Sequence, residues 1–107
     1  MRYSYKEDGE IKGFYELNPF PSCNQLIVSN HAFIAPDYRG NGSGKRASRE
    51  RIRKAIELGY DCMMCTCRAD NHVQVKILKK AGWSFAWAFH SKETNRTIQV
   101  WFLNLGE

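Results

Sequence analysis

Residues 38–45 read YRGNGSGK, and this segment places the strongest constraint on the architecture. Its three glycines stand between an apolar run that ends at Pro36 and a basic segment with helical periodicity. A glycine-rich turn between a strand and a helix points backbone N–H groups outward at the positive end of the helix dipole. The stretch therefore predicts a binding site for a phosphate-bearing ligand.

The segments around this turn predict an α+β domain with the element order β-β-β-α-β-α-β-β. Alternating or wholly apolar runs indicate strands, and a 3.6-residue stripe indicates a helix. The expected strands are 2–6, 11–17, 26–35, 61–67, 83–90 and 96–105, and the expected helices are 46–58 and a segment from a cap at Asp70 or Asn71 to Gly82. Residues 18–22 contain two prolines and predict a loop.

The connections predict a mixed, mostly antiparallel sheet with two main helices. The first helix joins two strands that should run parallel, and hairpins at both ends add antiparallel strands. We expect three apolar stripes to face inward or share a face: Ser48, Ile52, Ala55 and Ile56 on the first helix, Val73, Ile77 and Ala81 on the second, and Trp83, Phe85, Trp87 and Phe89 on the fifth strand.

Length and composition suit one folded domain over residues 1–107. No apolar run approaches the roughly 18 residues of a membrane span. The first eight residues are too polar for a signal peptide, so we expect a cytoplasmic protein without a membrane partner. The net charge of +5 favours anionic ligands.

The four cysteines do not predict a metal site. Cys62 and Cys65 are spaced as C-x-x-C, but they fall on an expected strand, where residues three apart point to opposite faces. Neither Cys23 nor Cys67 completes a second pair at zinc-finger spacing. Buried reduced thiols are the expectation.

Two familiar glycine-loop motifs do not fit the stretch. A Walker A loop needs Ser or Thr after its lysine, and Lys45 is followed by Arg46. The dinucleotide fingerprint G-x-G-x-x-G has a different spacing from that of Gly40, Gly42 and Gly44.

The pattern Arg39-x-x-Gly42-x-Gly44 resembles the coenzyme A signature of the GNAT family of N-acetyltransferases. A second segment, LKKAGW at 78–83, is similar to the family's closing Y-x-K-x-G-F motif, with Leu78 at the tyrosine position and Trp83 at the phenylalanine position. Together the two segments extend the resemblance over residues 31–83, and the flanking hairpins fit the family's strand order.

The resemblance implies acetyl-CoA as cofactor, with coenzyme A as product. Phe33 and Ile34 would line the pantetheine arm, and Lys45, joined by Arg46, would place positive charge near the phosphates. Asn71 would contact the cofactor near its thioester, or would only cap the second helix. The residues that would cradle the pyrophosphate with main-chain N–H groups are Arg39, Gly40, Asn41, Gly42, Ser43 and Gly44.

The implied reaction is direct transfer of an acetyl group to an amine, which must be neutral to attack. We expect His31 to act as the base because it shares a strand face with Phe33 and has a suitable reference pKa. A partly exposed strand histidine with a structural hydrogen bond is the competing interpretation. Leu78 cannot donate the proton that the family's tyrosine gives to the leaving thiolate, so water or another group must serve.

By this resemblance the chain begins near the family's second strand, so we expect a truncated GNAT-like fold without the usual first strand and the two helices that cover the acceptor groove. An open groove suits a large acceptor such as a protein amine, and uncovered apolar surface suggests a homodimer. The alternative function is a non-catalytic GNAT-fold module that binds or regulates a protein or nucleic acid. Nucleic-acid binding is less favoured, because the cations of the first helix surround it as a solvated face would.

Overall fold

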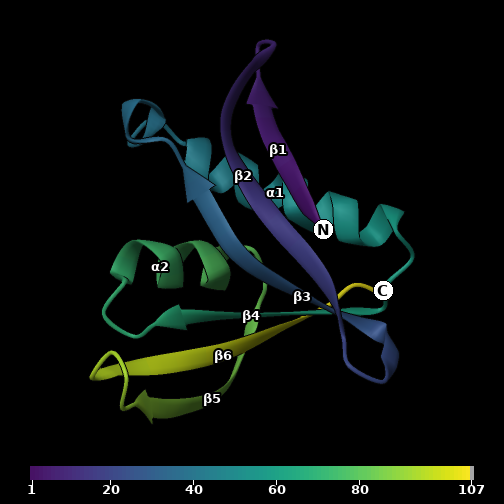
Figure 1. Ribbon diagram of the computed structural model, residues 1–107, viewed down its shortest axis with the longest axis vertical. Coiled ribbons are helices and arrows are strands. Elements are labelled where there is room, and N and C mark those ends of the chain that lie inside the picture. Colours follow the sequence, from purple (N-terminus) through teal and green to yellow (C-terminus); the bar gives the residue numbers. More distant parts are fainter. Residues whose placement is uncertain (107) are drawn as a thin grey trace.

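The computed structural model describes residues 1–106, except for the side chain of His31. The chain forms a single six-stranded sheet in the order β1-β2-β3-β4-β6-β5 (Figure 1). The elements are β1 Arg2–Glu7, β2 Glu10–Phe20, β3 Cys23–Ile34, the 3-10 helix η1 Pro36–Tyr38, α1 Ser43–Glu57, β4 Cys62–Arg68, α2 His72–Lys80, β5 Ser84–Ser91 and β6 Arg96–Asn104. The predicted α+β class and element order are confirmed.

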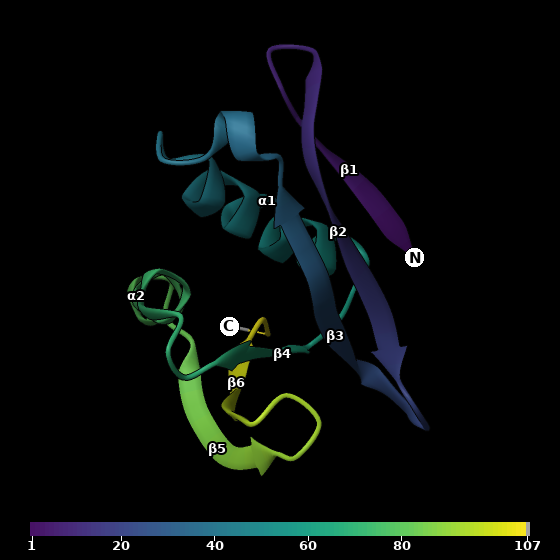
Figure 2. The same ribbon diagram turned by 60° about the vertical axis from the view of Figure 1, so that its left-hand side comes forward.

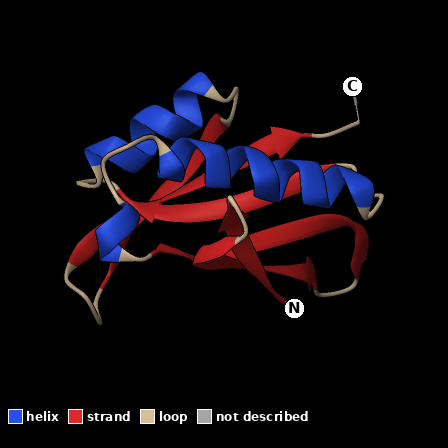
Figure 3. Ribbon diagram, turned by 90° about the horizontal axis from the view of Figure 1, so that it is seen from above, coloured by secondary structure: helices blue, strands red, loops and turns tan. Residues whose placement is uncertain are grey.

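Among the described residues, β3 and β4 are the one parallel pair of neighbours, and every other neighbouring pair is antiparallel. Both helices lie over the same side of the sheet (Figure 3). The core between them contains Ile27 and Met63 from the central strands, Ala55 from α1 and Leu78 from α2, each at most 1% exposed. Burial of this apolar layer stabilises the fold and fixes the angle at which the helices cross the strands.

The central parallel pair opens along its length. Leu26 to Ser29 of β3 pair with Cys62 to Cys65 of β4, and beyond that point the two strands diverge. Figures 1 and 2 show α2 beside the gap, with β3 and β4 leaving in different directions. The backbone of β3 on its β4 side therefore has no strand partner after Ser29 in the described chain.

The predicted loop at 18–22 is partly wrong, because β2 continues through Pro19 to Phe20. The N–H of Leu17 donates to the main-chain oxygen of Met1, at the end of β1. The nitrogen of Pro19 lies two residues further along β2 and points to the same edge, where β1 no longer provides an acceptor. A proline is tolerated there because no ladder hydrogen bond is lost. The turn itself is confined to Pro21 and Ser22.

The inward faces of both helices differ from the prediction. Ile56 is 53% exposed and Val73 is 73% exposed, whereas Arg51 and Leu78 are buried. The buried stripe of α1 consists of Ser43, Ser48, Arg51 and Ala55. Arginine counts as polar when an apolar stripe is identified in a sequence, so Arg51 is not predicted to be buried. The predicted inward face of α1 is therefore rotated by about one residue from the observed one.

The aromatic stripe of β5 is split by a bulge at Ala86. Phe85 pairs with Trp101 while Trp87 pairs with Val100, so the two aromatic residues point to opposite faces of the sheet. Phe85 packs edge-on against Trp101 on the helix-covered side, at 5.6 Å between ring centroids. The single shared face predicted for this strand is therefore wrong, because a β-bulge inverts the alternation.

All four cysteines are free thiols, and Cys62 and Cys65 alternate across β4 as expected. No group of three or more His, Cys, Asp or Glu side chains could hold a metal ion within the described part of the chain. Across the same residues, no helix has both the length and the apolar character needed to cross a membrane.

Candidate functional site: a groove between the glycine turn and α2

The glycine turn presents unpaired donors at the start of α1. Gly42 adopts φ 87° as the N-cap, and the helix begins at Ser43, three residues earlier than predicted. Such a positive φ is strained for residues with a side chain, which explains the glycine. The N–H groups of Gly44 and Lys45 hydrogen-bond to no atom of the described residues, so they are available to an anion at the positive end of the helix.

A groove of about 770 Å³ runs from this turn along the edge of β3 to α2. Most of the residues that the sequence predicts for cofactor binding line it, namely Phe33, Ile34, Arg39, Gly40, Gly42, Gly44, Lys45 and Asn71. The gap between β3 and β4 leaves room for the groove. The fold thus brings the strand, the turn and the second helix to one concave surface.

Asn41 and Ser43 are the two predicted turn residues that do not line the groove. The Ser43 side chain is fully buried behind the turn, where its Oγ lies 2.9 Å from Asn41 Oδ1 and 3.0 Å from Glu7 Oε1. Their side chains therefore fix the shape of the turn from behind.

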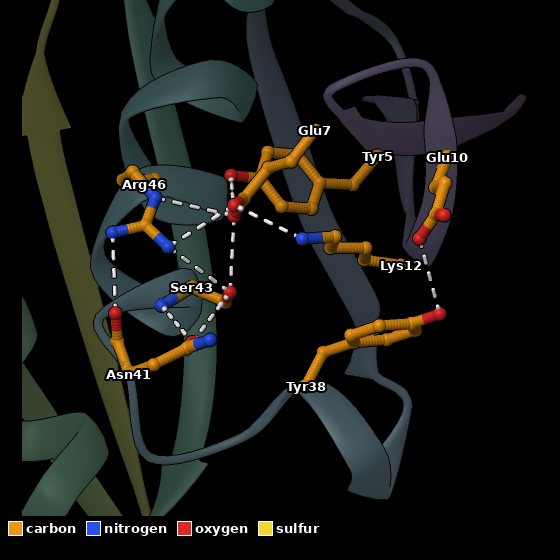
Figure 4. A network of polar contacts seen from close by, with 8 residues as sticks. All are labelled: Tyr5, Glu7, Glu10, Lys12, Tyr38, Asn41, Ser43 and Arg46. Atoms are coloured by element: carbon orange, nitrogen blue, oxygen red, sulfur yellow. Dashed lines mark hydrogen bonds and ion pairs between the residues drawn. The ribbon is translucent and has the colours of Figure 1, made fainter.

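Glu7, at the end of β1, is the centre of a polar network that holds the turn (Figure 4). Its carboxylate accepts two hydrogen bonds from Arg46, each 3.1 Å, and one of 2.6 Å from the Tyr5 hydroxyl. Lys12 lies 3.5 Å from the same carboxylate. These contacts, led by the hydrogen bonds from Arg46 and Tyr5, lower the pKa of Glu7 to about 2.

The Arg46 guanidinium forms its hydrogen bonds within the protein. Besides Glu7, its guanidinium donates to the main-chain oxygen of Asn41, 3.2 Å away, and it does not line the groove. The suggestion that Arg46 joins Lys45 beside the phosphates does not fit this position. Arg46 instead ties the first turn of α1 to the N-terminal hairpin.

Arg39 and Phe33 form one wall of the groove. The Nε atom of Arg39 donates to the Ile34 carbonyl over 2.7 Å, and its guanidinium lies 5.3 Å from the centre of the Phe33 ring. Phe33 stacks on Phe14 at 5.3 Å between ring centroids. These contacts hold a cation and an aromatic face at the groove.

Asn71 caps α2, since its Oδ1 accepts a hydrogen bond from the Gln74 N–H over 3.2 Å. The Nδ2 amide of the same side chain makes no hydrogen bond to the described residues, and the residue lines the groove. Capping is therefore established, and a cofactor contact by the amide is compatible with it.

The structure describes the predicted base, His31, and the position of the family's tyrosine, Leu78, to different extents. The backbone of His31 belongs to β3, but its side chain lies outside the described part of the chain. Leu78 is 0% exposed in the core, so α2 brings no hydroxyl to the site at this position.

The sequence prediction missed the contribution of α2. Five of its residues line the groove, namely Val73, Gln74, Lys76, Ile77 and Lys80. Positions 73, 76, 77 and 80 follow the spacing of one helical face. This spacing indicates a common face, but the apolar character of Val73 and Ile77 favours the core, and for that reason the sequence predicts both to face inward.

The family model for the acetyltransferase (GNAT) family matches residues 1–83. No curated protein matches the sequence.

Several solved structures share the fold. The yncA structure from Salmonella typhimurium, which contains its cofactor acetyl-CoA, is 15% identical with a TM-score of 0.83, covering 99% of this chain and 65% of that one. A Bacillus subtilis acetyltransferase in complex with CoA is 19% identical with a TM-score of 0.86, covering 97% of this chain and 76% of that one. The ribosomal-protein-S18-alanine N-acetyltransferase of Escherichia coli is 14% identical with a TM-score of 0.82, covering 100% of this chain and 70% of that one. The present chain thus spans about two thirds to three quarters of these proteins.

Replacement of Glu7 by glutamine should loosen the turn in a pH-dependent manner. The pKa of Glu7 is depressed in the folded state, so its stabilising contribution is present above the ordinary carboxyl pKa and is lost as the pH falls through about 2. We expect Glu7→Gln to lower Tm by a few degrees at pH 7, with the deficit shrinking toward pH 2. Thermal unfolding between pH 2 and pH 7 measures this.

The matched control is Glu57→Gln, which removes an exposed i,i+4 pair with Arg53 and should change Tm by no more than about a degree. Hydrogen exchange should accelerate at the amides of residues 40–46 in Glu7→Gln only. A deficit as large at pH 2 as at pH 7 would contradict the role given to the carboxylate.

Proposed function

The chain belongs to the acetyltransferase (GNAT) family, and we propose that it is an N-acetyltransferase that takes the acetyl group from acetyl-CoA. The observation that carries the proposal is a single groove that is lined both by the glycine turn, with the unpaired N–H groups of Gly44 and Lys45, and by four cationic residues. The cations are Arg39, Lys45, Lys76 and Lys80. Main-chain donors and positive charge along one groove suit the phosphates of coenzyme A.

Main-chain donors supply the main recognition of the diphosphate in this proposal. A charge beside a helix terminus contributes about 0.3–1 kcal/mol at an exposed position, so several oriented amides together exceed one lysine. Phe33 and Ile34 line the groove between the turn and the gap between β3 and β4, and they would hold the pantetheine arm. Asn71 offers its Nδ2 amide to the arm while its Oδ1 caps α2.

The bound thioester supplies an activated acetyl carbonyl. The residues of this chain have three tasks around it: to keep the amine neutral, to stabilise charge on the carbonyl oxygen, and to return a proton to the thiolate. Unpaired main-chain N–H groups of β3 beyond Ser29 serve the second task. Together these tasks form the new C–N bond and break the C–S bond.

For proton transfer we assign the base to His31, directly or through water, as expected from its place on β3. The third task falls to solvent, because Leu78 has no ionisable group and is buried. Loss of a general acid costs roughly 10²–10⁴-fold in rate. We therefore expect a lower rate than in relatives that carry the tyrosine.

We assign the acceptor to the amines of proteins, since the groove is open toward solvent along α2. The E. coli neighbour is described as acting on an alanine of a ribosomal protein, which is in line with such an acceptor. Nucleic acid is disfavoured, because Arg46 and Arg53 are paired with carboxylates and Arg51 is buried. The cytoplasmic location stays a prediction from the sequence.

Gly42→Ala tests the cofactor site. An alanine at φ 87° is strained, and its Cβ would lie 2.9 Å from Arg46 Nη1, so either the backbone of the turn or the Arg46 side chain that holds it must shift. We expect Kd for acetyl-CoA, measured by calorimetry, to rise about tenfold or more, and thiol release with mixed amines to fall in parallel.

Gly59→Ala is the control, because Gly59 has a similar φ of 89° at the far end of α1 with open space around it. Both variants should be destabilised by about 1 kcal/mol, but only Gly42→Ala should bind acetyl-CoA more weakly. No heat with millimolar acetyl-CoA on the unmodified protein would refute the proposal. Binding without thiol release would favour the non-catalytic module.

Substitutions at Asn71 separate its two roles. Asn71→Asp keeps a capping oxygen and removes the amide donor, whereas Asn71→Ala removes both. If the amide contacts the cofactor, Asn71→Asp should retain Tm and weaken acetyl-CoA binding about tenfold. Asn71→Ala should lose about 1 kcal/mol of stability in either case, because it removes the cap. A cap without a cofactor role differs only in predicting unchanged acetyl-CoA binding by Asn71→Asp.

We further propose a homodimer formed through the sheet face that the helices leave uncovered. This face carries a continuous apolar strip, consisting of Val28, Met64, Trp87, Phe89, Ile98, Val100 and Phe102. Trp87 is 65% exposed on the edge strand β5. Exposed apolar strips of this kind are typical of protein interfaces.

Trp87→Lys should therefore shift the protein from dimer to monomer in sedimentation equilibrium. Val73→Lys, which places a charge at a 73% exposed apolar residue on α2, is the control and should leave the mass unchanged. A monomeric unmodified protein at about 100 µM would contradict the dimer.

A further inference from the structure

Arg51 is a buried cation without an anionic partner. It points from α1 into the core, is 5% exposed, and pairs with no carboxylate of the described residues. Its single hydrogen bond runs from Nη1 to Ser29 Oγ over 2.9 Å, and its buried Nε atom has no partner. An uncompensated charge at such a site is strongly unfavourable.

No neighbouring group of the described chain neutralises Arg51. Burial raises the pKa of the Cys65 thiol to about 12, and it raises that of Cys67 as well, so both stay neutral thiols near pH 7. The face of Trp83 lies 6.0 Å from the guanidinium carbon and provides only a weak cation–π contact. Burial lowers the pKa of Arg51, yet a guanidinium stays protonated in proteins.

Arg51 lines a small cavity of about 90 Å³ beneath α1. Ser48, whose buried Oγ also lacks a hydrogen-bond partner, and Gln74 line it too. The cavity shares Ala32, Phe33, Ile34, Gly44 and Gln74 with the large groove, so the two are adjoining compartments. Arg51 lies two turns beyond Gly44, about 10 Å along the helix.

We propose that this cavity is a carboxylate subsite in which Arg51, with Ser48 and Gln74, receives the negative end of a substrate. A volume of about 90 Å³ is three times the roughly 30 Å³ that one water molecule occupies, which suits a carboxylate and not a phosphorylated sugar. The guanidinium matches a planar carboxylate through parallel N–H donors.

The identity of the ligand at this subsite rests on the proposed transferase function. The affinity of the subsite for a carboxylate does not depend on that function. The carboxylate belongs either to a dicarboxylic acyl chain on the donor or to an acceptor that carries its own carboxyl group. In both cases the cavity makes the protein selective for substrates with a carboxylate over neutral ones of the same length.

The first experiment tests the carboxylate without coenzyme A. Sodium acetate, compared with sodium chloride at equal ionic strength, should raise Tm of the unmodified protein and of the control Arg49→Met, whose side chain is exposed on the same helix. Arg51→Met should lose this shift. Its Tm in chloride should equal or exceed that of the unmodified protein, since an unpaired buried charge has been replaced by an apolar chain.

The second experiment identifies the source. Binding of succinyl-CoA is compared with that of butyryl-CoA, and transfer from acetyl-CoA to β-alanine is compared with transfer to propylamine. We expect a preference of about tenfold or more for the carboxylate partner in one of these two pairs. Arg51→Met should abolish that preference while Kd for acetyl-CoA stays within about twofold.

The outcomes are separable from those of the proposed function. An acetate shift that depends on Arg51 supports the subsite even if no acyl-CoA binds, a result that would refute only the transferase. An Arg51-dependent preference in either substrate pair also supports it. The proposal is overturned if neither acetate nor either pair reveals a carboxylate preference, or if the preference survives in Arg51→Met.

Discussion

The separation of β3 and β4 beyond Ser29 and Cys65 is the constraint on which the rest of the site depends. A parallel pair that stayed in register to its end would satisfy its backbone within the sheet and leave no space beside α2. Because the strands diverge instead, the edge of β3 remains unpaired and the groove extends along it. The glycine turn follows this edge directly, so the donors of α1 lie at the mouth of the same groove.

The turn is held from outside the segment that forms it. Glu7 belongs to the first strand, yet its carboxylate fixes Arg46, and Arg46 in turn holds the Asn41 carbonyl. The N-terminal hairpin is therefore a structural part of the site although none of its residues lines the large groove. A charged side chain that contacts its own protein in this way is unavailable to a ligand, which separates the roles of the adjacent residues Lys45 and Arg46.

The sequence was sufficient for the element order, the mixed sheet and the glycine turn, because these follow from local periodicity and from residues with unusual backbone requirements. The sequence was insufficient where long-range packing determines which residues are buried and where a strand ends. The charged guanidinium of Arg51 predicts a surface position although the residue is buried, and the bulge at Ala86 inverts an otherwise regular alternation in β5. Pro19 continues β2 because the neighbouring strand β1 has already ended at that point. The groove face of α2 was misassigned because Val73 and Ile77 are apolar, as core residues are. The roles of individual residues in catalysis, that of His31 above all, stay predictions.

The dependence of the turn on Glu7 also bears on how the chain folds. Glu7 and Arg46 are 39 residues apart in sequence, so their contact closes a long loop and is entropically costly to form early. We expect pairing of the first three strands to precede this contact, whereas α1 can form by local contacts. On that expectation the ligand cradle is ordered late, and any ligand that binds only the completed cradle would shift the folding equilibrium toward the native state.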